Sequence, residues 1–84
     1  MISTDTIQHF TISIIVVNRA GALSRITGLF SKRGYNIDTL TVGPMAERPG
    51  YSRLILASSG DEATKAQIIK QLRKLVDVAE AKTI

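Results

Sequence analysis

The residues best suited to bind a ligand follow the most apolar stretch of the chain, in the segment Asn18-Arg19-Ala20-Gly21-Ala22-Leu23. A helix that begins here could hold an anion, because its first N–H groups lack helical partners and its dipole is positive at that end. Gly21 and Ala22 have little bulk, so a ligand could approach the backbone closely. Asn18 offers a donor and an acceptor, which suits a ligand with an ammonium and a carboxylate. The same residues also fit a plain turn, so from spacing alone both interpretations stay open.

A second polar group lies in Arg33-Gly34-Tyr35-Asn36-Ile37, where a helix is expected to end and an edge strand to begin. An amide at this place is most often a turn residue. Asn36 would join a ligand site if a second copy of the chain presented its own Asn18 loop across that edge.

Catalytic chemistry is poorly supplied. The only histidine, His9, is expected at an exposed strand end, with no cysteine and no serine–acid pair nearby. Asp61 and Glu62 are explained by the charge preference of a helix start. No group of His, Asp and Glu has metal-ligand spacing, and the chain has no cysteine. We therefore expect a protein that is not an enzyme and has no metal or cofactor.

The charge balance of 11 basic to 7 acidic residues, a formal +4, raises nucleic acid as a partner. An RNA-binding sheet of this size stacks bases on aromatic side chains, and the central strands offer only Phe10 and Tyr51. We therefore expect no nucleic acid. No apolar run of about 20 residues exists and the first residues do not resemble a secretion signal, so we expect a cytoplasmic protein without a membrane contact.

Hydrophobic periodicity predicts four strands and two helices. The strands are rich in β-branched or alternating apolar residues and are expected at Phe10–Val17, Tyr35–Val42, Tyr51–Ser58 and Leu75–Ala81. Apolar residues spaced three and four apart predict two helices. The first has Leu23, Ile26, Leu29 and Phe30 on its apolar face and ends at Gly34. The second starts near Asp61 and has Ile68, Ile69, Leu72 and Leu75 on its apolar face. The Pro/Gly pairs at 43–44 and 49–50 predict a hairpin with a loose tip.

The order β-α-β-β-α-β predicts an α+β, ferredoxin-like domain, with a four-stranded antiparallel sheet and two helices on one face. Right-handed crossovers place the first and third strands in the centre and the second strand on an edge. We expect residues 8–84 to form a single domain and residues 1–7, which carry little pattern, to fray. A chain of 84 residues buries too little surface for high stability, so we also expect self-association.

The segment from Asn18 to Leu40, N-R-A-G-A-L-S-R-I-T-G-L-F-S-K-R-G-Y-N-I-D-T-L, resembles the ACT domain of the regulatory small subunit of acetohydroxyacid synthase (acetolactate synthase). The start Gly-Ala-Leu-Ser-Arg, the centre Gly-Leu-Phe-Ser and the end Arg-Gly-Tyr-Asn-Ile are specific together. A looser likeness continues through Thr41-Val42, Ser52-Arg53 and residues 71–78.

The resemblance implies a regulatory subunit that performs no chemistry. Such a subunit binds the thiamine-diphosphate-dependent catalytic large subunit, activates it, and confers feedback inhibition by a branched-chain amino acid, usually valine. The effector would lie at the interface of a homodimer formed through the second strand and the first helix. By position, one chain would hold the head group with Asn18, Gly21, Ala22 and Leu23. The neighbouring chain would contribute Asn36 and Ile37.

Many members of this family continue into a second domain, whereas this sequence ends at Ile84. A short natural form and a truncated one are both compatible with that end. The main alternative function is an ACT-type amino-acid sensor that acts on a different partner enzyme. A nucleic-acid module and a small ferredoxin-like enzyme are further alternatives, each with a weaker basis in the residues.

Overall fold

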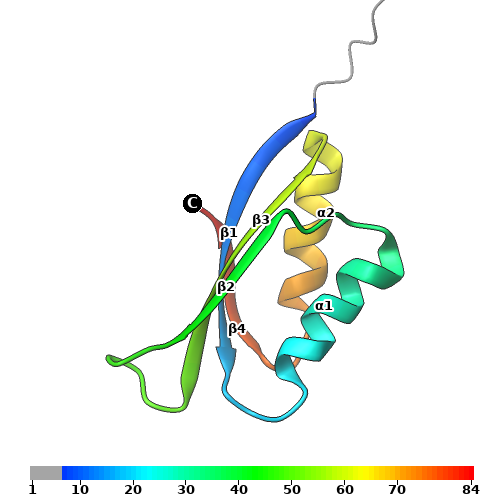
Figure 1. Ribbon diagram of the computed structural model, residues 1–84. Helices are drawn as coiled ribbons and strands as arrows, with labels where there is room; N and C mark the ends of the chain where they lie inside the picture. The colour runs from blue at the N-terminus through cyan, green and yellow to red at the C-terminus, as the bar shows by residue number, and fades with distance from the viewer. Residues whose placement is uncertain (1–6) are drawn as a thin grey trace, which may run out of the picture.

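In the computed structural model, which describes residues 7–84, these residues form four strands and two helices (Figure 1). The elements are β1 (Gln8–Val17), α1 (Ala22–Arg33), β2 (Thr39–Pro44), β3 (Tyr51–Gly60), α2 (Glu62–Arg73) and β4 (Val78–Thr83). The segment expected to fray lies outside the described residues, except for Ile7, which is exposed.

The four strands form one antiparallel sheet in the order β2-β3-β1-β4. This confirms the predicted ferredoxin-like arrangement, with the first and third strands in the centre and the second on an edge. Figure 1 shows both helices on the same face of the sheet. Each edge strand, β2 and β4, consists of six residues, whereas β1 and β3 have ten each.

The core lies between the helices and the two central strands. Ile12 and Ile14 of β1 stand opposite Leu56 and Leu54 of β3, and all four are at most 1% exposed. They pack with the buried helix residues Ile26, Phe30, Ile68 and Leu72. Burying one such side chain stabilises the fold by about 1.5–3 kcal/mol. Ile15, on the opposite face of β1, is only 5% exposed, so the end of this strand is buried on both faces as predicted.

Two strands begin later than the sequence predicted. β2 starts at Thr39 and not at Tyr35, because the left-handed Gly34 (φ 72°) turns the chain and the Tyr35 N–H donates back to the Phe30 carbonyl at 2.8 Å. β4 starts at Val78 and not at Leu75, since the α2 end continues as turns. In both places apolar residues that look like strand positions belong to loops.

The hairpin tip between β2 and β3 is ordered by hydrogen bonds, so the expected loose tip is wrong. Met45 and Tyr51 are joined by a bond from the Met45 N–H to the Tyr51 carbonyl at 3.1 Å, and the Tyr51 N–H donates to Arg48. Met45 is buried, and the Arg48 guanidinium stacks 4.0 Å above the centre of the Tyr51 ring. Neither of the two helices in residues 7–84 has the length and apolarity needed to cross a membrane.

Candidate ligand site

The first turn of α1 has no side-chain cap from the described part of the chain. Its N-cap is Gly21, which adopts the left-handed backbone conformation (φ 86°), and no side chain among residues 7–84 accepts from the first N–H groups. The first turn also contains no acidic residue. The other helix differs, because the Asp61 carboxylate caps α2 by accepting from the Thr64 N–H at 2.7 Å. The α1 start is therefore the helix end that leaves donors and positive charge available.

Backbone hydrogen bonds fix the loop that leads into α1. The Asn18 N–H donates to the Gly50 carbonyl at 2.8 Å, and the Val17 N–H donates to the Asp77 carbonyl at 2.9 Å. The Asn18 side chain is exposed. The loop thus has a hydrogen-bonded backbone and an exposed Asn18 side chain.

The other predicted residues of this loop differ in what they can offer. Gly21 is exposed, and Leu23 has 41% of its surface exposed. Ala22 is only 3% exposed, and its N–H donates to the Arg19 carbonyl at 3.2 Å. A ligand at this helix start would therefore meet the Leu23 side chain and backbone groups, but not the Ala22 methyl group.

Asn36 and Ile37 lie at the other end of α1. Figure 1 shows the loops before and after this helix at its opposite ends, about 18 Å apart for 12 residues at 1.5 Å each. The Asn36 side chain donates to the Asp38 carboxylate, the Asn36 carbonyl accepts from the Ser58 hydroxyl at 2.5 Å, and Ile37 packs against the core. A single chain therefore does not bring Asn36 to Asn18.

A buried carboxylate holds two arginines beside the α1 start. Asp77 is 1% exposed; its Oδ2 accepts from Arg25 Nε at 2.5 Å, and its Oδ1 lies 3.3 Å from Arg19 Nε. The strand expected at Leu75–Ala81 included Asp77, which instead lies in the loop before β4, while both arginines remain about half exposed. The signal was present in Val76-Asp77-Val78, since an acid between two apolar residues needs a partner if it is buried.

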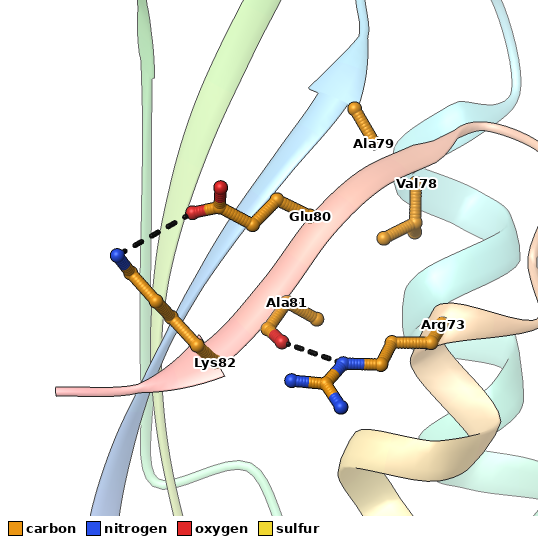
Figure 2. Close-up of a pocket in the computed structure, with 6 residues that line it drawn as sticks. All are labelled: Arg73, Val78, Ala79, Glu80, Ala81 and Lys82. Atoms are coloured by element: carbon orange, nitrogen blue, oxygen red, sulfur yellow. Dashed lines mark hydrogen bonds and ion pairs between the residues drawn. The ribbon is translucent and has the colours of Figure 1, made fainter.

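The remaining polar residues form no reactive constellation in the described part of the chain. His9 is exposed, and its Nδ1 lies 3.8 Å from Asp38 Oδ2. No group of His, Cys, Asp and Glu within residues 7–84 could hold a metal ion. A hollow of about 400 Å³ lies along β4, lined by Arg73 and residues 78–82, and it contains none of the predicted site residues (Figure 2).

Comparison with known proteins places these features in one family. Residues 12–80 match the family described as AHAS small subunit-like ACT domain. The acetolactate synthase isozyme 3 small subunit of Escherichia coli is 54% identical over 67 residues, which cover 80% of this chain and 40% of that protein. The probable acetolactate synthase small subunit of Methanothermobacter thermautotrophicus is 40% identical over 84 residues, which cover the whole chain and 49% of that protein.

A solved structure agrees with the sequence relatives. The crystal structure of the acetolactate synthase small subunit from Thermotoga maritima superimposes with a TM-score of 0.83 at 39% identity, covering 90% of this chain and 47% of that one. The chain thus spans less than half the length of these relatives. Fold, motif and relatives together identify the chain as a member of the AHAS small subunit-like ACT domain family.

Proposed function

We propose that this domain binds valine, or a related branched-chain amino acid, and regulates the catalytic large subunit of acetohydroxyacid synthase. The observation that carries the proposal is the open start of α1 beside the exposed Asn18 amide. The effector carboxylate would meet the N–H groups of the helix start, and its ammonium would meet Asn18 and backbone carbonyls. The domain itself would perform no chemistry, and activation and feedback inhibition would act through the large subunit.

The two sheet edges differ in a way that supports a dimer through β2. Along β4, Lys82 and Glu80 pair at 3.7 Å, and Arg73 Nε donates to the Ala81 carbonyl at 3.0 Å (Figure 2). Charged side chains and covered carbonyls discourage strand pairing. The β2 sequence Thr-Leu-Thr-Val-Gly-Pro has no charge, and its Val42 is 51% exposed.

Pairing of two β2 strands about a two-fold axis would complete the effector site. Asn36 precedes the start of β2, whereas Asn18 is bonded to Gly50 at the end where β2 finishes. Antiparallel pairing sets the start of one β2 beside the end of the other. The partner's Asn36 and Ile37 would then approach the Asn18 loop, giving two equivalent sites per dimer.

The effector would regulate the enzyme only by binding two states of the assembly unequally. An apolar pocket at the dimer interface would select the effector side chain. One methylene changes affinity by only about 1–3 kcal/mol, so valine, leucine and isoleucine would be ranked and not sharply separated.

Calorimetric titration of valine into the purified chain tests the site. We expect binding to the wild type and a loss of about tenfold or more in Asn18→Ala, because the amide contacts a charged group. The control is Gln67→Ala, which removes an exposed amide from α2 and should bind as the wild type does. No binding by the wild type, or equal affinity in Asn18→Ala, contradicts the site.

A pull-down with the chain immobilised tests the partner. We expect it to retain the acetohydroxyacid synthase large subunit from the same organism. If valine binds but the large subunit is not retained, the domain is an amino-acid sensor for a different enzyme.

A further inference from the structure

The cluster around Asp77 carries more positive charge than its carboxylate neutralises. Two guanidinium groups, from Arg19 and Arg25, face one buried carboxylate, so the cluster has one excess positive charge. Both contacts use the Nε atoms of the arginines. The terminal nitrogens Nη1 and Nη2 have no hydrogen-bond acceptor among residues 7–84, and both side chains are about half exposed. These donors can therefore reach a ligand.

The excess charge stands at the helix start. A Cβ atom built on Gly21 would lie 3.1 Å from Nη1 and 3.6 Å from Nη2 of Arg25. Arg25 thus lies directly over the residue that caps α1, in the space that the missing glycine side chain leaves open. The guanidinium and the free helix N–H groups share one small region, which is suited to a carboxylate.

Asp77 explains why Arg25 stays there. The carboxylate is 1% exposed and comes from the loop between α2 and β4, 52 residues after Arg25. Its hydrogen bond to Nε holds the guanidinium where Nη1 and Nη2 lie beside Gly21. The Oδ1 atom has no hydrogen bond within residues 7–84, so the contact to Arg19 is the looser of the two.

We propose that Arg25 binds the carboxylate of the amino-acid effector and that Asp77 is the positioning residue that holds Arg25 in place. The inference rests on the proposed function and deepens it. The Arg25 guanidinium would add a charged group with two parallel N–H donors to a site otherwise built from the Asn18 amide and backbone groups. It also ties the effector loop to the start of β4, so that occupancy of the site acts on both segments.

The competing explanation is that Arg25 and Asp77 form a purely structural ion pair. Comparing the binding of two ligands distinguishes this explanation from a role of Arg25 in effector binding. Valine has a carboxylate, whereas valinamide has the same ammonium and side chain without that charge. Calorimetry on the full chain should give tighter binding of valine than of valinamide. In Arg25→Met we expect valine affinity to fall about 10- to 100-fold, with much less change for valinamide. A purely structural arginine would weaken both ligands equally.

Asp77→Asn changes valine affinity in opposite directions for a positioning role and for general electrostatic attraction. The substitution adds one net positive charge, so general attraction of the anion predicts tighter binding of valine. Asparagine has one acceptor oxygen in place of two, so a positioning role predicts weaker binding by several-fold. Arg25→Lys keeps the charge without the parallel donors and should also bind valine less tightly. Far-UV circular dichroism checks folding, and if Asp77→Asn does not fold, the two Arg25 variants decide.

The matched control is Arg53→Met, which removes the same charge from an exposed position on β3. It should bind valine as the wild type does. Valine affinity unchanged in Arg25→Met, or reduced equally for both ligands, overturns the role of Arg25 while leaving the effector site intact. Tighter binding by Asp77→Asn overturns the positioning role. Absence of valine binding by the wild type overturns the proposed function, and this inference with it.

Discussion

Gly21 combines an unusual backbone conformation with a position next to the charged Arg25 side chain. Its φ of 86° is a conformation that favours glycine, and its open side leaves room for the Arg25 guanidinium. A methyl group at this position would therefore act twice, through the backbone and through the neighbouring arginine. Gly34, at the other end of α1, has a similar φ of 72°, but a Cβ atom added there would have nothing within 4 Å.

The pair Gly21→Ala and Gly34→Ala separates these two effects. Both variants should lower the free energy of unfolding by about 1–2 kcal/mol, since each forces alanine into the left-handed region. Only Gly21→Ala should also weaken valine binding, because the new Cβ displaces Arg25. Urea unfolding and calorimetry measure the two quantities. Equal valine affinities in the two variants would contradict a role for the Arg25 position.

Asp77 illustrates which part of the site the sequence could not reveal. The motif around Asn18 indicated the helix start, because a loop of small residues and the helical spacing after it are local properties. The contacts of Asp77 with Arg19 and Arg25 depend on how the α2–β4 loop returns beneath the first loop, 58 and 52 residues further along the chain. In the sequence, the only sign of this long-range pairing is a single acidic residue between apolar residues.

At the scale of the elements, the two helices begin in opposite ways. α2 is capped by its own Asp61, whereas α1 starts at an uncapped glycine. A capped start stabilises the helix, and an uncapped one keeps its donors for another group. The difference is consistent with a structural role for α2 and a binding role for α1.

The α2 cap makes the stability depend on acidic pH. Hydrogen bonds from Thr64, first from its side chain and then from its backbone, lower the pKa of Asp61, and the Gln8 and Lys65 side chains lower that of Glu62. A pKa lower in the folded than in the unfolded chain favours the folded state above the unfolded pKa. The free energy of unfolding should therefore fall as the pH decreases through about 4.5 and below, as followed by urea unfolding.

Asp61→Asn is the control for this dependence. Asparagine caps helices about as well as aspartate, so stability at pH 7 should change little. Because asparagine does not titrate, the decrease below pH 4 should be shallower than in the wild type. An unchanged slope would mean that other groups dominate the acid response.

The strand boundaries show how far periodicity describes the elements. Every predicted strand and helix exists, and the topology follows from their order. The starts of β2 and β4 were wrong because Tyr35 and Leu75 pack against the core from loops; the Tyr35 ring lies edge-on to Phe30 at 5.7 Å. Apolar character reports burial, and burial alone does not separate a strand from a loop that folds over the core.

At the scale of the whole molecule, the two edge strands of the sheet, β2 and β4, differ in their side chains. On β4 the Ala81 carbonyl accepts from Arg73 and the Lys82 and Glu80 side chains pair with each other, whereas on β2 Val42 is 51% exposed. The proposed dimer through β2 would be closed, because it would use the same edge of both chains.

Val42→Lys tests assembly and effector binding together. A lysine on an edge strand opposes pairing, and because Val42 is 51% exposed, the fold of the single chain should tolerate it. The matched control is Ala79→Lys, which places the same charge at an exposed position on β4 (Figure 2). Sedimentation should give a dimer for the wild type and for Ala79→Lys, and a monomer for Val42→Lys. Valine binding should be lost together with the dimer. Asn18 and Asn36 lie at opposite ends of α1, so only a second chain can bring them together. If a Val42→Lys monomer bound valine as tightly as the wild type, the whole site would lie within one chain.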